Sequence, residues 1–357
     1  MINYAFFSRS IPICRQAQLF FLLILMGFLP KILYAQDQKP VVSAFQISGK
    51  IFLDGVLDED EWTSAVAINA LTMVEPETGS QASLETDVKI LVDKSNIYLG
   101  ITCYEEDPGD IVSYSKARDS DLRGEDYVKF VFDTYLDSRS GFIFAVNPYG
   151  SRYDALVSRF GESENSNWDA VWSAKSRIHE KGWTAEIKIP VKTLSFDKNL
   201  NEWGFNIERR VQRKLELNRW TAISNDIPLG QTNNAGLLAG LPAFNLGIGL
   251  IIRGSTNLDY NNSFVEDSKT GWNNSLDITE RFTPDITGHI TVNTDFAETE
   301  VDSRRTNLTR FPLLYPEKRS FFLQGADIYE FGFGLGHDII PYFSRKIGLF
   351  EGQPVPL

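Results

Sequence analysis

The stretch NTDFAETEVDSRRTNLTRFPLLYPEKRSFFLQG, residues 293–325, follows a segment in which apolar and polar side chains alternate. In that segment Ile290 and Val292 fall on one side of an extended chain, and His289 and Thr291 fall on the other. Such alternation is typical of a strand with one apolar and one polar face. A soluble sheet shows this pattern, and so does an outer-membrane barrel, whose strands take roughly 10 residues each. The pattern by itself leaves both architectures open.

The residues before this segment predict a hairpin. The run from Leu276 to Phe282 alternates in the same way, and residues 283–285 supply a Thr-Pro-Asp turn. Another alternating run begins at residue 246, and the Gly and Pro residues between 242 and 249 indicate a junction with the preceding domain.

The strings NTDFAETEVD, NLTRFPLLYPEKRSFFLQG and PYFSRKIGLF resemble the hallmark strings of a bacterial outer-membrane family. Members of that family carry a family-9-like carbohydrate-binding domain ahead of a β-barrel, and the resemblance covers nearly the whole mature chain. It implies that residues 246–357 are the N-terminal part of an outer-membrane β-barrel domain. A complete single-chain barrel needs at least about eight strands, so this barrel is either truncated or completed by partner chains, and we expect truncation.

The N-terminus predicts an export signal over residues 1–35. Arg9 and Arg15 give a positive start without an acidic residue, an apolar run extends from Leu19 to Leu29, and residues 33–35 offer a cleavage site. The alternative, a membrane anchor, needs about 20 apolar residues, and this run is shorter. We therefore expect an exported protein of the periplasm or outer membrane of a Gram-negative bacterium.

The charge balance is acidic, with 35 Lys and Arg against 47 Asp and Glu and a formal net charge of −12. Because phosphate binding needs basic patches, we expect no nucleic-acid partner. Cys103 is the only cysteine after the predicted cleavage, so we expect no disulfide within the chain and a small core residue at this position. The three histidines are too widely separated in sequence to predict a metal cluster.

Residues 43–241 contain a series of short strand-like runs with turn residues between them. Ala185, Ile187 and Ile189 alternate with polar neighbours, and Asn-Pro-Tyr-Gly at residues 147–150 is typical of a hairpin turn. Strands at this spacing, without a long helical period, predict an all-β fold: an antiparallel β-sandwich with two packed sheets.

Four strings in this region resemble the family-9 carbohydrate-binding module. They are KIFLDGVLDEDEW at residues 50–62, VKILVDKSNIYLGITCYEED at residues 88–107, DYVKFVFDTYLDSRSGFIFAVNPYG at residues 126–150 and GWTAEIKIPVKTL at residues 182–194. The resemblance implies a sandwich of jelly-roll type that binds polysaccharide or oligosaccharide in carbohydrate catabolism. In that family these strings mainly mark the fold, so they support the fold more strongly than the sugar contacts.

Sugar binding uses exposed aromatic rings together with fixed polar groups for the hydroxyls. Trp168 and Trp172 follow the polar loop at residues 161–167, so we predict them as exposed platforms for a sugar ring. The alternative is packing at the rim of the sandwich. Glu75 and Arg118 are predicted polar contacts by their position in the family resemblance.

The loop RDSDLRGED, residues 118–126, invites a calcium hypothesis. An EF-hand is excluded, because Arg123 stands where the third ligand belongs and Phe130 where the bidentate Glu should be. A looser calcium site would combine backbone carbonyls with the carboxylates of Asp119, Asp121, Glu125 and Asp126. The alternative is a solvated loop on an acidic protein.

The sequence shows no catalytic constellation, since it contains no G-x-S-x-G elbow, no H-E-x-x-H and no phosphate loop. The first functional hypothesis is glycan binding at the cell envelope. The second is an outer-membrane channel or transport protein whose sandwich is a periplasmic scaffold. The third is a membrane-associated hydrolase of O-glycosyl bonds, because modules of this family often occur in the same polypeptide as a hydrolase domain.

Overall fold

The computed structural model describes residues 39–245, 250–261, 269–283 and 286–292, with residue 322 and residues 349–350 and 353–354. The predicted export signal at residues 1–35 lies outside the described residues, as do the strings NTDFAETEVD and NLTRFPLLYPEKRSFFLQG except for Phe322. The chain divides into two units, Met1–Gln38 and Lys39–Leu357, and all the described residues belong to the second.

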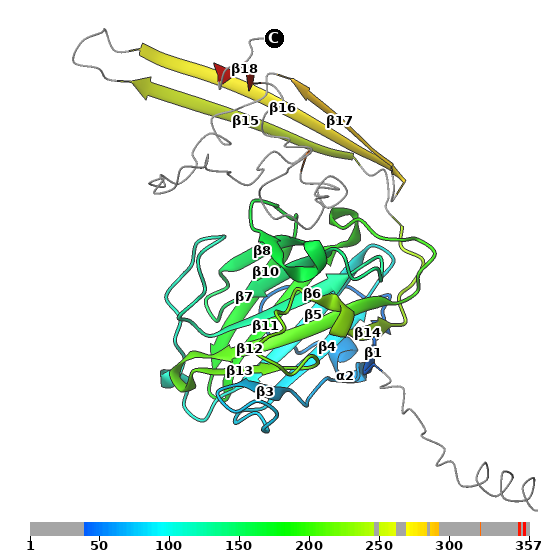
Figure 1. The fold of residues 1–357 in the computed structure, drawn as a ribbon, viewed down its shortest axis with the longest axis vertical. Helices are drawn as coiled ribbons and strands as arrows, with labels where there is room; N and C mark the ends of the chain where they lie inside the picture. Colours follow the sequence, from blue (N-terminus) through cyan, green and yellow to red (C-terminus); the bar gives the residue numbers. More distant parts are fainter. Residues whose placement is uncertain are drawn as a thin grey trace, which may run out of the picture. The chain divides into compact units, whose positions relative to one another are not determined.

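The main body consists of two β-sheets (Figure 1). The larger sheet runs in the order β1 (Val41–Ser43), β14 (Gly236–Ala239), β12 (Trp203–Val211), β6 (Tyr127–Asp133), β7 (Gly141–Val146), β8 (Arg152–Ser158) and β9 (Ser163–Asn165), and β13 (Glu216–Arg219) links β12 to β3 (Thr72–Glu75). The smaller sheet runs in the order β10 (Ser173–His179), β11 (Gly182–Pro190), β5 (Asn96–Tyr104), β4 (Thr86–Val92) and β2 (Phe45–Gln46).

Most neighbouring strands are antiparallel, and the parallel pairs are β1 with β14 and β2 with β4. Short helical segments connect the strands: α2 (Asp60–Ser64), η1 (Pro108–Asp110), η2 (Arg159–Gly161), η3 (Val191–Thr193), η4 (Gln212–Lys214) and η5 (Thr232–Asn234). The sequence-based prediction of an all-β, mainly antiparallel sandwich is confirmed.

The core lies between the two sheets. On β6, Phe130 and Phe132 point inward, and on β11 Ala185, Ile187 and Ile189 meet them from the other sheet, all with no exposed surface. Successive side chains of a strand point to opposite faces, so the neighbours of these core residues face outward. Cys103 lies in the same core, as its apolar strand predicts, and burial raises its pKa to about 12.

The outer face of the larger sheet carries a second, smaller apolar cluster. Val131, Ile143, Ala155 and Val157 point to this face, and Leu229 from the loop after β13 covers them. The covered patch occupies one end of the strands β6, β7 and β8, where the register pairs Val131 with Ile143 and Ile143 with Ala155. The other end of the same strands is left for the pocket described below.

A third sheet joins β15 (Leu250–Asn261), β16 (Lys269–Thr283) and β17 (Ile286–Val292). Its register places Leu276 opposite Val292 and Ile278 opposite Ile290, so the predicted antiparallel pairing around the turn is confirmed. The turn residues 284–285 lie outside the described residues. Large apolar side chains of one face are exposed within this sheet: Ile252, Trp272, Leu276, Phe282, Ile286, Ile290 and Val292.

Near the end of the chain, β18 (Leu349–Phe350) pairs with β19 (Gln353–Pro354). No helix in the described part of the chain combines the length and the apolar character that crossing a membrane requires.

Candidate functional site

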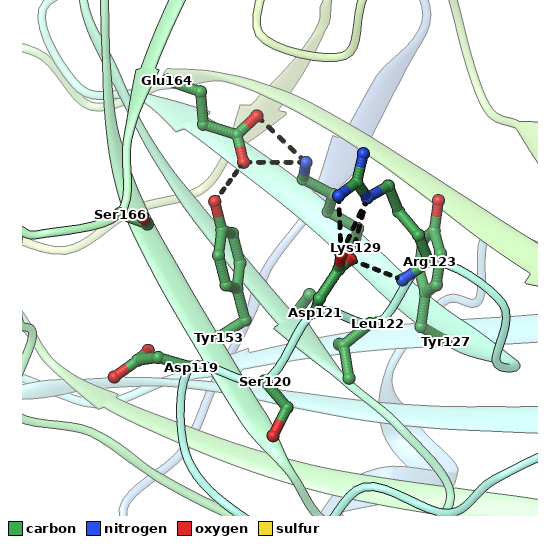
Figure 2. A pocket seen from close by; sticks show the side chains of 11 residues that line it. Asp119, Ser120, Asp121, Leu122, Arg123, Tyr127, Lys129, Tyr153, Glu164 and Ser166 are labelled. Atoms are coloured by element: carbon green, nitrogen blue, oxygen red, sulfur yellow. Dashed lines mark hydrogen bonds and ion pairs between the residues drawn. The ribbon is translucent and has the colours of Figure 1, made fainter. Parts of the chain in front are cut away.

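A pocket with a volume of about 400 Å³ opens on the outer face of the larger sheet. Its floor belongs to β6, β7 and β8, and its walls belong to β9 with the residue after it and to the loop 119–123. The side chains that line it are shown in Figure 2: Asp119, Ser120, Asp121, Leu122, Arg123, Tyr127, Lys129, Ala145, Tyr153, Glu164 and Ser166.

Strand alternation explains the floor of the pocket. Tyr127 and Lys129 take outward positions on β6, on either side of the buried Val128. The register then sets Lys129 beside Ala145 of β7 and Ala145 beside Tyr153 of β8. Because the middle position of this row carries only a methyl group, the side chains on both sides border an open space.

A polar trio occupies one side of the pocket. The ammonium of Lys129 lies 2.9 and 3.0 Å from the two carboxylate oxygens of Glu164, and the hydroxyl of Tyr153 donates to the same carboxylate at 2.6 Å. The ammonium also lies 5.7 Å from the centre of the Tyr153 ring, within the range of a cation–π contact. These contacts hold all three side chains in defined positions.

A second ion pair forms part of the wall. The guanidinium of Arg123 contacts both carboxylate oxygens of Asp121, with distances of 2.9 and 3.0 Å from Nε and 2.6 Å from Nη2. Hydrogen bonds from Arg123 lower the pKa of Asp121 to about 2. Both side chains are largely exposed, so the pair adds little to stability, and its two charges cancel.

The two tyrosines stand on opposite sides of the pocket in the view of Figure 2. Burial raises the pKa of both phenols above the ordinary value of 10, with Glu208 adding to the effect for Tyr127 and Glu164 for Tyr153. Both hydroxyls are therefore neutral near pH 7. Among the described residues the Tyr127 hydroxyl has no hydrogen-bond partner, whereas the Tyr153 hydroxyl is bound to Glu164.

The loop 119–123 is anchored from behind by Arg118. Its Nη2 atom donates to Asp154 at 2.7 Å and to the carbonyl of Ala170 at 3.0 Å, and it lies 3.0 Å from Asp169. The Nε atom lies 3.4 Å from the carboxylate of Asp119. The structure thus places the predicted sugar contact Arg118 in a network behind the wall, and Arg118 does not line the pocket. Its contact with sugar stays a prediction.

The expectation that Trp168 and Trp172 are exposed is wrong. Only 8% of Trp168 and 3% of Trp172 is accessible to solvent, and both belong to the core. The Trp168 ring lies 4.9 Å from that of Phe142 and the Trp172 ring 5.1 Å from that of Phe144, measured between centroids. The loop turns these rings inward because β7 offers them an apolar face, so neither presents an open ring to a ligand.

Glu75 lies on β3 and pairs with Arg210 of β12 at 2.8 Å. The carboxylate is partly exposed, and it does not line the pocket. The structure therefore does not bring Glu75 and Arg118 together. It also places neither of them beside an exposed tryptophan. The role of Glu75 in sugar binding also stays a prediction.

The four carboxylates of the predicted calcium site are not brought together. Asp121 pairs with Arg123, and Asp119 with Arg118. The buried Glu125 accepts hydrogen bonds from the backbone of residues 114 and 115 and from Asn147, and the buried Asp126 accepts from the backbone of residues 112 and 212. In the part of the chain that the structure describes, no group of three acidic, His or Cys residues could hold a metal ion.

Sequence reasoning missed the main pocket residues Tyr127, Lys129, Tyr153 and Glu164. A signal was present in the string DYVKF, where a tyrosine and a lysine occupy outward positions of a strand with an apolar inner face. The partners from β8 and β9 could not be found in this way, since they meet β6 only through the register of the sheet.

Solved structures give distant likenesses. One is a carbohydrate binding module family 9 (CBM9) from Caldicellulosiruptor kristjanssonii in complex with cellotriose, with 14% identity, a TM-score of 0.42, and coverage of 56% of this chain and 93% of that chain. A structure of a CBM9 from the same organism in complex with glucose shows 14% identity, a TM-score of 0.41, and coverage of 56% and 95%. Both likenesses are too distant to assign a shared fold or ligand.

Among curated proteins, none matches this chain. Residues 255–353 match a family described as a domain of unknown function (DUF5916). The match covers the segment that begins within β15 and ends at β19, and it leaves out both sheets of the main body, including the larger sheet that carries the pocket. Over that segment the chain is similar to the DUF5916 family.

Proposed function

We propose that this protein binds carbohydrate, with the pocket on the outer face of the larger sheet as the binding site. One observation carries the proposal: the pocket of about 400 Å³ combines two tyrosines with three carboxylates and two cations, namely Asp119, Asp121, Glu164, Arg123 and Lys129. Ligand pockets in proteins measure roughly 300–1,000 Å³ and combine apolar or aromatic surface with a few fixed polar groups. A sugar presents the matching chemistry, because its ring has apolar C–H faces and its edge carries hydroxyls.

The polar groups of the pocket suit hydroxyl binding. The Tyr127 hydroxyl is neutral and can donate or accept, the Asp119 carboxylate can accept, and Lys129 is held in place by Glu164. Hydrogen bonds to a charged group are stronger than those between neutral groups. Because these groups are positioned before the ligand arrives, little ordering is needed on binding.

We propose that this binding occurs at the cell envelope and contributes to carbohydrate catabolism. The export signal at residues 1–35 and the hallmark strings support an exported protein of the periplasm or outer membrane. The strings also support assignment of residues 246–357 to the start of an outer-membrane barrel.

A calorimetric titration of the full chain with neutral oligosaccharides tests the proposal. Tyr127→Phe removes one hydroxyl and should weaken binding by about 0.5–1.5 kcal/mol, roughly two- to tenfold. Tyr104→Phe is the matched control, because it removes the hydroxyl of a strand tyrosine that binds Asp87 in the other sheet. If a panel of neutral glucose-, mannose- and xylose-based oligosaccharides shows no binding, or if both variants weaken it equally, the pocket is not the site.

A second candidate is an outer-membrane channel or transport protein. The exposed apolar side chains on one face of the sheet β15–β17 favour it, since a lipid-facing strand needs such a face. Ile290→Lys places a charge on that face and should reduce recovery of the chain in the outer-membrane fraction. Thr291→Lys, on the opposite face, should have a smaller effect. Equal recovery of both variants would count against this candidate.

A further inference from the structure

The pocket also indicates which class of sugar it accepts. We propose that it selects neutral sugars and excludes sugars that carry a carboxylate, such as uronic acids. The inference rests on the proposed function and deepens it, because it assigns a specificity to the same site. It follows from how the charges around the pocket are paired.

Each cation that lines the pocket is already engaged by a carboxylate. Arg123 is held by both oxygens of Asp121, and Lys129 is held by both oxygens of Glu164. A ligand carboxylate would have to displace one of these internal partners and leave it unpaired. Among the described residues that line the pocket, no further cation is available to receive it.

Asp119 adds a negative charge that is only partly balanced. Its nearest cation is Arg118, at 3.4 Å, and the guanidinium of Arg118 makes closer contacts with Asp154 and Asp169. One positive charge therefore serves three carboxylates. Burial raises the pKa of Asp119 above its ordinary value, the charge of Arg118 opposes this shift, and the nearby Asp169 adds to it to a smaller extent.

The physical consequence is an unequal cost for the two classes of sugar. A neutral hydroxyl can donate a hydrogen bond to Asp119 without bringing a new charge. A ligand carboxylate would lose water and approach a pocket lined by three carboxylates (Asp119, Asp121 and Glu164) and only two cations (Arg123 and Lys129), on a protein whose formal net charge is −12. The hydroxymethyl group of a hexose and the carboxylate of the corresponding uronic acid occupy the same position, so this comparison isolates the charge.

The experiment uses the full chain and two matched pairs of ligands: D-glucose with D-glucuronate, and D-galactose with D-galacturonate. Calorimetry at pH 7 should show at least about tenfold weaker binding of the uronate in each pair that binds. The ratio of neutral-sugar affinity to uronate affinity should fall as salt is added, because ions screen the repulsion between the ligand carboxylate and the acidic pocket.

Two charge-matched variants locate the effect. Asp119→Asn removes the extra charge from the pocket and should reduce the preference for the neutral sugar several-fold. Glu180→Gln removes an equal charge from an exposed turn that does not line the pocket, and should leave the preference unchanged. The inference is supported if the ratio of neutral-sugar affinity to uronate affinity falls in the Asp119 variant and stays unchanged in the Glu180 variant.

The possible failures can be told apart. If the neutral sugar and its uronate bind within twofold of each other, the specificity is wrong and the carbohydrate site stands. If the Glu180 variant changes the ratio as much as the Asp119 variant, net charge causes the preference and the inference is overturned. If neither these monosaccharides nor the neutral oligosaccharides bind, the proposed function fails and the inference with it.

Discussion

The carboxylate of Asp154 accepts a hydrogen bond from the indole nitrogen of Trp172 at 2.9 Å, and both side chains are buried. The same carboxylate accepts from Arg118 at 2.7 Å and from the backbone nitrogen of Ala170 at 2.6 Å. One acid on β8 therefore joins the loop before Trp172 to the residue behind the pocket wall. Tyr153, its neighbour on the strand, faces the pocket from the other side of the sheet.

Trp172→Ala should destabilise the fold by about 3–5 kcal/mol, because it opens a cavity in the core and removes one donor from Asp154. Urea denaturation measures the change. Val171→Ala is the adjacent control: Val171 is 52% exposed, and its truncation should cost no more than about 0.5 kcal/mol. If the Trp172 variant kept its stability but lost sugar binding, the result would show that the Trp172 ring contacts the sugar.

Glu125→Gln should show a stability loss that depends on pH. Burial alone would raise the pKa of Glu125, but hydrogen bonds from Ser115, Tyr114 and Asn147 outweigh it and hold the pKa below the ordinary value of 4.5. A carboxyl with a lowered pKa in the folded state adds stability above its unfolded pKa, and this stability is lost as the pH falls through the folded pKa. The loss in the variant should therefore be about 1–3 kcal/mol at pH 7.

The difference in unfolding free energy between wild type and Glu125→Gln should narrow as the pH falls below 4.5. Glu180→Gln, which alters an exposed carboxylate, serves as the control for the loss of one negative charge. A difference that stays constant from pH 7 to pH 3 would mean that the hydrogen bonds do not favour the charged form of Glu125.

Calcium should not raise the melting temperature through the loop 118–126. A ligand that binds only the folded state raises the midpoint of unfolding, and this loop holds its four acids on separate partners. Thermal unfolding with added calcium and with a chelator measures the effect. A rise that Asp121→Asn abolishes would show that the loop rearranges into a metal site.

Gly182→Ala should be far more destabilising than Gly79→Ala. Both glycines have left-handed backbone angles, φ +132° and +88°. A Cβ at Gly79 would meet nothing within 4 Å. Gly79→Ala should therefore lower the free energy of unfolding only by the backbone strain of an alanine at positive φ, about 1–2 kcal/mol. A Cβ at Gly182 would come within 2.0 Å of the backbone carbonyl of Cys103, which the pairing of β11 with β5 holds in place. Equal melting temperatures for the two variants would contradict this account.

The sequence by itself determined which segments are strands and which of their side chains face inward. Ala185, Ile187 and Ile189 are core residues because successive side chains of a strand point to opposite faces, whatever the neighbouring strand is. The same local rule predicted the apolar face that Ile290 and Val292 present on β17. Properties of this kind depend only on neighbours in the chain.

Only the tertiary structure decided where the site residues lie. Trp172 looked exposed after a polar loop, yet Phe144 and Asp154 from other strands give it a buried place. Lys129 and Glu164 meet only because three strand pairings bring β6 and β9 to one face. Such contacts depend on the register between segments far apart in sequence, because a shift of one residue would turn each side chain to the other face.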